Sequence, residues 1–183
     1  TNPKQLTMKI SNIALLLGLV SISALAKSQS PANKAASSPV NTIEGEWVRM
    51  SPVGPIGLTF KPDGTVEGDL GRDNSVDIVS AYSLENNTIT FRDKEGVSCP
   101  GKGVYKMEIT DYYLSFDLIE DNCGGRLKST LGFWVRPDFE DRMEPLAKKI
   151  SDSAEPEDYL NRARIYLALG KSPEAKKDLD QYL

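Results

Sequence analysis

The stretch CPGKGVYKMEITDYYLSFDLIEDNCGGRLKSTLGFWVR, residues 99–136, decides the fold of this chain. Apolar and polar residues alternate over 103–109 and again over 114–119, with a short polar segment between them. Alternation with a period of two on both sides of a short turn predicts a β-hairpin. A further strand is expected over 126–136. The stretch therefore predicts the last three strands of an antiparallel sheet.

Five more strands are predicted before this stretch, each bounded by turn residues such as Pro62-Asp63-Gly64. Their ranges are 43–48, 56–60, 65–70, 76–84 and 88–92. Eight short strands joined by short turns predict a mainly β fold, an eight-stranded antiparallel meander barrel with a C-terminal α-helical hairpin. A sandwich is the weaker interpretation because the sequence shows no long crossover connection. Closure of eight strands also removes exposed edges.

Large side chains dominate the face of each strand that is expected to point inward. They are Ile43, Trp47, Leu58, Phe60, Val66, Tyr82, Leu84, Ile89, Phe91, Tyr105, Met107, Ile109, Leu114, Phe116, Leu118, Leu127, Leu131 and Phe133. An eight-stranded barrel has an interior just wide enough for side chains or one small ligand. We therefore expect a filled barrel. The alternative is a shallow ligand site at one mouth, near Tyr82, Tyr105, Tyr112 or Tyr113.

The N-terminal segment has the pattern of a secretory signal. Met8-Lys9 precedes an apolar run over 13–22, and Ala24-Leu25-Ala26 has the small-x-small form of a cleavage site. We predict a signal peptide over 1–26, with extra residues before Met8, and a flexible linker over 27–42. An uncleaved anchor is the alternative, although the run is about half of the ~20 apolar residues that span a bilayer. The chain is thus expected to be exported, periplasmic or extracellular, with no transmembrane segment in its mature form.

Export would place the two cysteines in an environment where they can form a disulfide. In an oxidising compartment Cys99 and Cys123 are expected to form a disulfide, since two cysteines can pair in only one way. Closing this loop is worth roughly 3.5 kcal/mol in the chain-entropy model. Asp121 and Arg126 flank the second cysteine, and we expect them to form an exposed ion pair worth at most ~1 kcal/mol.

The composition excludes several chemistries. The chain contains no histidine, so a Ser-His-Asp triad, a Cys-His pair and a histidine zinc site are all excluded. A net charge of −4 argues against nucleic acid as a partner. Acidic residues occur in turns rather than as a pair facing each other across a cleft. We therefore expect a protein that is not an enzyme, with no catalytic residues, no cofactor and no bound metal.

The first and last strands carry a pattern seen in a known superfamily. Gly45-x-Trp47, together with Trp134 and the basic residue that follows it, resembles the lipocalin-like arrangement. In that superfamily a Trp and a late Arg close the base of the barrel. The resemblance implies structural roles in barrel closure for Trp47, Arg126, Trp134 and Arg136.

The second half of the predicted barrel is similar to small secreted bacterial lipocalin-like domains of uncharacterised function. Those domains have a Cys, a Tyr within a strand, Leu-x-Phe in the next strand and an Asp-x-Cys-x-x-Arg motif. The matching residues here are Cys99, Tyr105, Leu114-Ser-Phe116 and Asp121-Asn-Cys123-Gly-Gly-Arg126. The resemblance covers residues 43–137 and implies a barrel domain of that kind.

The apolar period changes from two to 3.6 after Pro137, so residues 138–183 are expected to be helical. Pro156 and Pro173 are placed to begin helices, and Gly170 to end one. The segment resembles a tetratricopeptide repeat, either complete or incomplete. The residues that carry this resemblance are Tyr159, Ala163, Tyr166, Gly170, Ala175 and Leu179. An unrelated helical hairpin is the alternative.

Three functions remain open at this point. The first is a secreted or periplasmic binding module, in which the barrel is a scaffold and residues 138–183 dock an unknown protein partner. The second is a carrier or sensor of a small apolar ligand held in the barrel. The third is a secreted protease inhibitor that uses the linker over 27–42 as an inhibitory arm.

Overall fold

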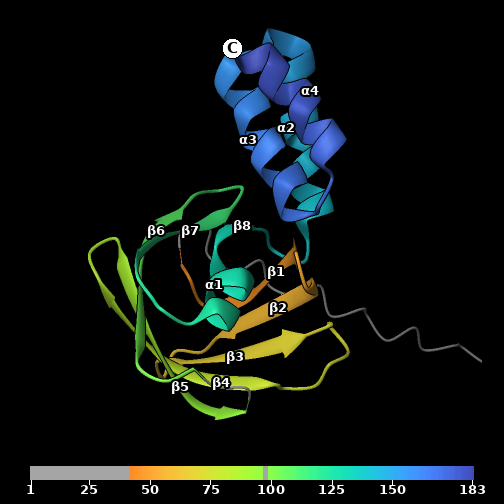
Figure 1. Cartoon of the computed structure of the whole chain (residues 1–183). Coiled ribbons are helices and arrows are strands. Elements are labelled where there is room, and N and C mark those ends of the chain that lie inside the picture. Colours follow the sequence, from red (N-terminus) through yellow and green to blue (C-terminus); the bar gives the residue numbers. More distant parts are fainter. Residues whose placement is uncertain (1–41, 97–98) are drawn as a thin grey trace, which may run out of the picture. The chain divides into compact units, whose positions relative to one another are not determined.

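A computed structural model of the chain describes residues 42–96 and 99–183 (Figure 1). Eight antiparallel strands follow one another in sequence order and form a nearly closed meander barrel, so the predicted fold class is confirmed. The strands are β1 (Gly45–Ser51), β2 (Gly54–Phe60), β3 (Thr65–Leu70), β4 (Ile78–Glu85), β5 (Thr88–Gly96), β6 (Lys102–Ile109), β7 (Leu114–Glu120) and β8 (Gly132–Trp134). The predicted signal peptide, and the linker up to residue 41, lie outside the described residues.

The barrel closes between its first and last strands through a short contact. The backbone N–H of Val48 donates to Val135 O over 2.8 Å, and the N–H of Val135 donates to Val48 O over 3.0 Å. Strand β8 is only three residues long and pairs with residues 114–116 of β7. Closure thus depends on one antiparallel bridge rather than on a long ladder.

The strand predicted over 126–136 is wrong in its first half. Residues Gly124–Thr130 form the helix α1, and β8 begins only at Gly132. A helix is favoured because it directs the apolar side chains Leu127 and Leu131, four residues apart, toward the barrel core. It also buries Arg126, which a strand starting at that residue would have placed at its exposed end.

Aromatic rings fill the part of the interior that lies beside β5, β6 and β7. Phe91 meets Tyr105 and Phe116 edge to face, with ring centroids 5.8 Å apart in both pairs, and Phe116 meets Trp134 at 6.4 Å. Such edge-to-face pairs are the arrangement that aromatic rings prefer. Three residues expected inside are not there: Leu84 and Leu118 are exposed because they lie near strand ends, and Phe133 packs against the helical segment.

The helical segment contains α2 (Phe139–Ser153), α3 (Pro156–Ala168) and α4 (Ser172–Tyr182). A second buried cluster joins it to the barrel strands, and its members are Val48, Val135, Leu146, Ile150, Ile165 and Ala168. Within the hairpin of α3 and α4, Arg162 Nε donates to Asp178 Oδ2 over 2.7 Å. The apolar faces of α2 and α3 are thus occupied by the chain's own residues.

A candidate ligand pocket beside a buried ion network

The barrel is not filled throughout. A pocket of about 290 Å³ lies between the inner face of β2–β5 and the helix α1. Its volume is at the lower end of the ~300–1,000 Å³ typical of ligand sites. The strands contribute a mainly aliphatic wall: Ile56, Leu58, Val66, Gly68, Leu70, Ile78, Ser80, Phe91 and Asp93. We call this space the barrel pocket, and it corrects the expectation of a packed interior.

Two of the inward residues at the barrel pocket, Gly68 and Ser80, are small. Val66, Gly68 and Leu70 alternate along β3 toward the interior, and Ser80 opposite Val66 is also directed inward. A Cβ atom on Gly68 would lie 3.5 Å from Ile78 Cβ and 3.6 Å from Leu58 Cδ2, which are ordinary contacts. A methyl group at this position would thus fit against the pocket wall, whereas a larger side chain would extend into the pocket.

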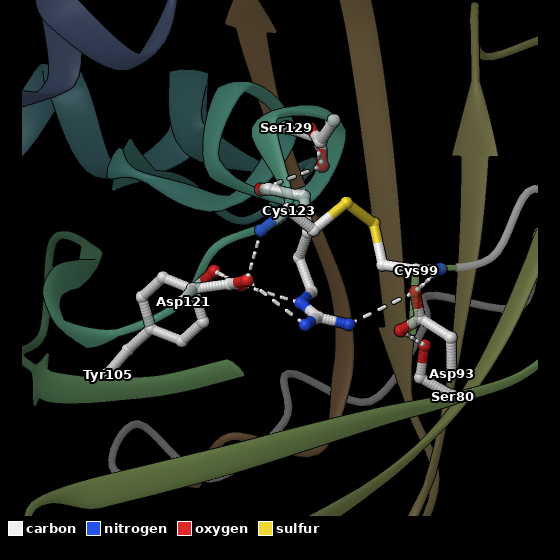
Figure 2. Close-up of a disulfide and its surroundings, with 9 residues drawn as sticks. Ser80, Asp93, Cys99, Tyr105, Asp121, Cys123 and Ser129 are labelled. Atoms are coloured by element: carbon white, nitrogen blue, oxygen red, sulfur yellow. Dashed lines mark hydrogen bonds and ion pairs between the residues drawn. A yellow bond between two sulfur atoms is a disulfide. The ribbon is translucent and has the colours of Figure 1, made fainter. Parts of the chain in front are cut away.

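The helix α1 forms the remaining wall through residues 125, 126 and 128–130. Its N-cap residue is Cys123, which forms a disulfide with Cys99 in the connection between β5 and β6 (Figure 2). The two Cα atoms are 5.9 Å apart, and the predicted disulfide is confirmed. Cys99 itself also lines the barrel pocket. The covalent link thus joins two parts of the pocket wall.

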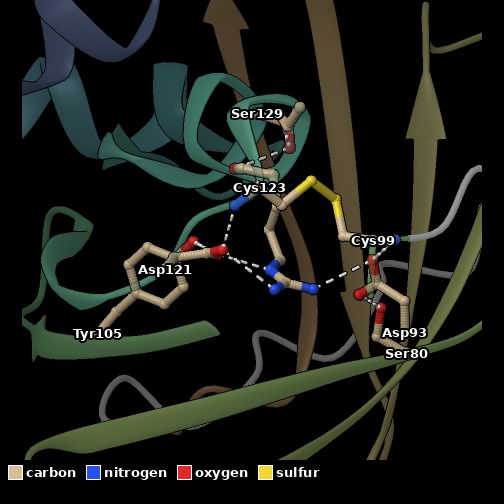
Figure 3. A network of polar contacts seen from close by, with 9 residues as sticks. Ser80, Asp93, Cys99, Tyr105, Asp121, Cys123 and Ser129 are labelled. Carbon is tan, nitrogen blue, oxygen red and sulfur yellow. Dashed lines mark hydrogen bonds and ion pairs between the residues drawn. A yellow bond between two sulfur atoms is a disulfide. The ribbon is translucent and has the colours of Figure 1, made fainter. Parts of the chain in front are cut away.

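A network of charged side chains lies directly beside the disulfide (Figure 3). Arg126 Nε and Nη2 donate to Asp121 Oδ2 and Oδ1 over 2.6 and 3.1 Å, and Nη1 lies 3.2 Å from Asp93 Oδ2. The hydroxyl of Tyr105 also donates to Asp121. The side chains of Arg126, Asp93 and Asp121 are only 6%, 4% and 1% exposed. We call these four residues the Arg126 network.

The expected ion pair of Asp121 and Arg126 is present, but the prediction that it is exposed was wrong. The sequence places both residues in a polar turn, whereas α1 folds that turn back over the barrel. Arg126 Nη1 is buried and has an ionic contact with Asp93 without the geometry of a hydrogen bond. A buried charge that loses its partner costs several kcal/mol. The pair therefore matters more to stability than an exposed one would.

The network shifts the ionisation of its members. Burial raises the pKa of Asp121, but the hydrogen bonds from Arg126, Tyr105 and the N–H of Cys123 outweigh it and leave that pKa below its usual value. Burial lowers the pKa of Arg126, and the two carboxylates reverse this shift. The pKa of Tyr105 is raised by burial and by its bond to Asp121. All three groups are therefore held in their usual charge states at neutral pH.

A glycine on β6 makes room for the network. A Cβ atom on Gly103 would lie 2.3 Å from Asp121 Oδ2 and 2.6 Å from Arg126 Nε. Real Cβ atoms do not approach other atoms so closely. Asp121 and Arg126 can approach β6 this closely only because position 103 carries no side chain.

The other residues assigned to barrel closure lie elsewhere in the barrel. The Arg136 guanidinium lies 3.8 Å from the centroid of the Trp47 ring and donates to Glu44 O over 2.7 Å and to Thr42 O over 2.6 Å. Burial lowers the pKa of Arg136 to about 10. Trp134 is buried, and its Nε1 donates to Thr130 O. Arg136 and Trp47 thus join the segment after β8 to the segment that begins the barrel. Arg126 belongs instead to the Arg126 network.

The four tyrosines expected near a ligand mouth do not line the barrel pocket among the described residues. Tyr105 is buried in the Arg126 network, and the hydroxyl of Tyr82 donates to Lys61 O over 2.9 Å. Tyr112 packs against the second buried cluster, which joins the helices to the barrel. Tyr113 lies against Phe133, with ring centroids 5.4 Å apart. The structure therefore does not bring all four tyrosines together. Tyr112 and Tyr113 instead line a second, more open hollow, beside Arg164 of α3.

Gly68, Ser80 and Asp93 line the pocket but were not predicted from the sequence. Gly68 and Ser80 went unnoticed because the inward face was identified by its large residues. Asp93 was assigned to the turn after a strand over 88–92. Strand β5 instead continues to Gly96, and a register shift pairs Ser80 with Asp93, so the carboxylate points inward and accepts from Ser80 Oγ over 2.8 Å. The alternation through 89, 91 and 93 was the available signal.

Comparisons of the chain with protein-family models, with curated proteins and with solved structures found no match. In the part of the chain that the structure describes, none of the helices is long and apolar enough to cross a membrane. Over the same residues, no group of three or more potential ligand side chains could hold a metal ion.

Proposed function

We propose that this chain is an exported, non-enzymatic binding protein that holds a small apolar ligand in its barrel, as a carrier or a sensor. The observation that carries the proposal is the barrel pocket, about 290 Å³ of space with an aliphatic wall. Apolar cavities with a few fixed polar groups are the usual form of small-molecule sites.

The polar groups at the pocket support an apolar ligand rather than a charged one. Ser80 Oγ and the N–H of Cys99 both donate to Asp93, and Arg126 is held by Asp121. These groups largely satisfy one another: only Arg126 Nη1 lacks a hydrogen bond, and its contact with Asp93 already balances its charge. A charged ligand group placed inside would therefore lose its water for little return. The energy of binding would come from apolar surface, at about 25 cal/mol per Å² buried.

Export is supported by the signal-like pattern over 1–26 and by the disulfide. Disulfides form and persist mainly in oxidising compartments. Cys99 and Cys123 pair in the structure with Cα atoms 5.9 Å apart, within the range of disulfides generally. A periplasmic or extracellular location is therefore part of the proposal.

Two functions considered from the sequence gain no specific support. Docking of a protein partner by residues 138–183 would use an apolar helical face, but Leu146, Ile150 and Ile165 already pack against Val48 and Val135. The tetratricopeptide-like interpretation of that segment stays a prediction. A protease inhibitor would use the linker over 27–42, of which only residue 42 is described.

Binding of the uncharged fluorescent dye N-phenylnaphthylamine tests the proposal. The wild-type chain is expected to bind the dye with one site and enhanced fluorescence. In Gly68→Leu the added side chain would occupy the pocket, so binding should be lost. Gly57→Leu is the matched control, because a Cβ on Gly57 would face Glu46, Asp69 and Arg72 at 3.8 Å or more, outside the barrel.

The result depends on the difference between the two leucine variants. Dye binding by wild type and Gly57→Leu, but not by Gly68→Leu, would support the proposal. Equal binding by all three proteins would place the dye elsewhere, and absence of binding by the folded wild type would reject an apolar ligand site in the barrel. Far-ultraviolet circular dichroism shows whether each variant retains its β structure.

A further inference from the structure

We propose that the Cys99–Cys123 disulfide controls how fast a ligand enters and leaves the barrel pocket, so that reduction by a dithiol speeds release. This inference rests on the proposed function because it concerns the same pocket. It concerns the rate at which the ligand enters and leaves the pocket, which the proposed function leaves open.

The disulfide lies at the edge of the barrel pocket and links two parts of its wall. Cys99 is part of the pocket lining, and Cys123 is the N-cap of α1. Five of the seven residues of α1 also line the pocket: Gly125, Arg126, Lys128, Ser129 and Thr130. A movement of the N-terminal end of α1 away from the connection between β5 and β6 would widen the pocket on this side. The disulfide opposes that movement directly.

A second, non-covalent link runs parallel to the disulfide. The N–H of Cys99 donates to Asp93 Oδ2 and the N–H of Cys123 donates to Asp121 Oδ1, both over 2.8 Å. Arg126 joins these two carboxylates. Each cysteine is thus fixed by one carboxylate of the network. Without the covalent bond, this link would hold α1 in place on average while still allowing it to open.

The other end of α1 is fixed independently. Thr130 O accepts hydrogen bonds from Trp134 Nε1 over 2.9 Å and from Arg49 Nη1 over 3.4 Å. Leu127 and Leu131 also pack against the barrel core. Reduction is therefore expected to free the N-terminal end of the helix about a fixed C-terminal end, which is a local opening rather than unfolding of the barrel.

Reduction of the disulfide by a dithiol proceeds by thiol–disulfide exchange. Cys99 and Cys123 are both half-buried rather than enclosed in the core. One thiolate of the dithiol attacks a sulfur of the disulfide, the Cys99–Cys123 bond breaks, and a mixed disulfide forms. The second thiol of the dithiol then displaces the protein sulfur. Two electrons and two protons pass to the protein, which keeps two free thiols, and the dithiol becomes a cyclic or linked disulfide.

Stopped-flow dissociation of N-phenylnaphthylamine tests the inference on the full chain. The dye is chased from oxidised protein, from protein reduced with dithiothreitol, and from the double variant Cys99→Ser/Cys123→Ser. We expect dissociation to be about tenfold faster from the last two forms, because the covalent restraint on α1 is absent. Gly68→Leu, which should bind no dye in either redox state, controls for binding outside the pocket.

The outcomes separate this inference from the proposed function. Faster release from both forms without the disulfide, with unchanged circular dichroism, supports it. Equal release rates from a protein that binds the dye reject the inference and leave the proposed function intact. Loss of β structure on reduction also rejects it, because the disulfide would then be needed for folding. Failure of the oxidised protein to bind the dye rejects the proposed function.

Discussion

Arg126 Nη1 lies 3.2 Å from Asp93 Oδ2, although the two residues are 33 positions apart in the sequence and belong to α1 and β5. The same guanidinium holds Asp121 through its other two nitrogens. One buried cation thus joins the helix that closes the barrel pocket to the strand that forms its wall. The stability of this end of the barrel is expected to depend on that cation.

Replacement of Arg126 by Met should destabilise the protein strongly. The change keeps much of the apolar volume but leaves Asp93 and Asp121 buried without their positive partner, which typically costs about 3–5 kcal/mol. Urea unfolding followed by tryptophan fluorescence gives the free energy. Arg72→Met is the matched control, because Arg72 forms an exposed pair with Glu46 and should lose less than ~1 kcal/mol. Similar losses in both variants would contradict the account.

Gly103→Ala should also destabilise the protein, although it adds a single methyl group. The new Cβ would lie 2.3 Å from Asp121 Oδ2, so the Arg126 network would have to move. Overpacking of this kind costs roughly 1–3 kcal/mol. Gly124→Ala, where no atom lies within 4 Å of the new Cβ, provides the comparison and should be close to neutral. Thermal unfolding of both variants measures the difference, and equal midpoints would be inconsistent with the close contact.

Acid should weaken the protein partly through Asp121. Its pKa is lower in the folded protein than in the unfolded chain, because hydrogen bonds from Arg126, Tyr105 and Cys123 outweigh the effect of burial. The folded state therefore binds fewer protons, and stability increases with pH. This contribution is complete above the unfolded pKa of about 3.9 and is lost as the pH falls through the folded pKa.

The variant Asp121→Asn isolates that contribution. It should be less stable than wild type at pH 7, and its stability should fall less steeply as the pH is lowered below about 4. The exposed residue Asp117 offers the control variant Asp117→Asn. Parallel curves of unfolding free energy against pH for wild type and Asp121→Asn would show that this carboxylate does not contribute.

Arg136→Lys should loosen the contact between the first and last parts of the barrel. Lysine keeps the charge but cannot donate to Thr42 O and Glu44 O from two nitrogens while it lies over the Trp47 ring. Loss of a hydrogen bond from a charged group costs about 1.5–3 kcal/mol, and the lower end is expected here because both acceptors are only part-buried. Denaturant unfolding measures this loss, and the emission of Trp47 should shift toward that of a more solvated ring. A stability equal to that of wild type would contradict the assigned role.

The strand pattern was predictable because alternation and turn residues act locally. Pro62-Asp63-Gly64 and the alternating residues of β6 and β7 each carry their own signal. The helix α1 was not predictable in the same way. Its residues carry a weak local preference, and burial of Arg126 between Asp93 and Asp121 involves a strand distant in the sequence.

The barrel pocket was missed for a related reason. A cavity depends on which small residues meet across the interior, and Gly68 becomes informative only when it is known to lie between Leu58 and Ile78. The sequence shows the size of each inward side chain but not the register that brings them together. Large inward residues elsewhere in the barrel therefore gave a misleading expectation of a filled interior.

The central claim is that the space beside Gly68 is an apolar pocket that a ligand can enter. Crystals pressurised with xenon test it directly, because xenon binds in apolar cavities and scatters strongly. The account predicts a xenon atom in contact with Leu58, Val66 and Gly68 in the wild-type protein, and none at that position in Gly68→Leu. Side chains that fill this space in the crystal, or wild-type crystals with no xenon at that position, would contradict it.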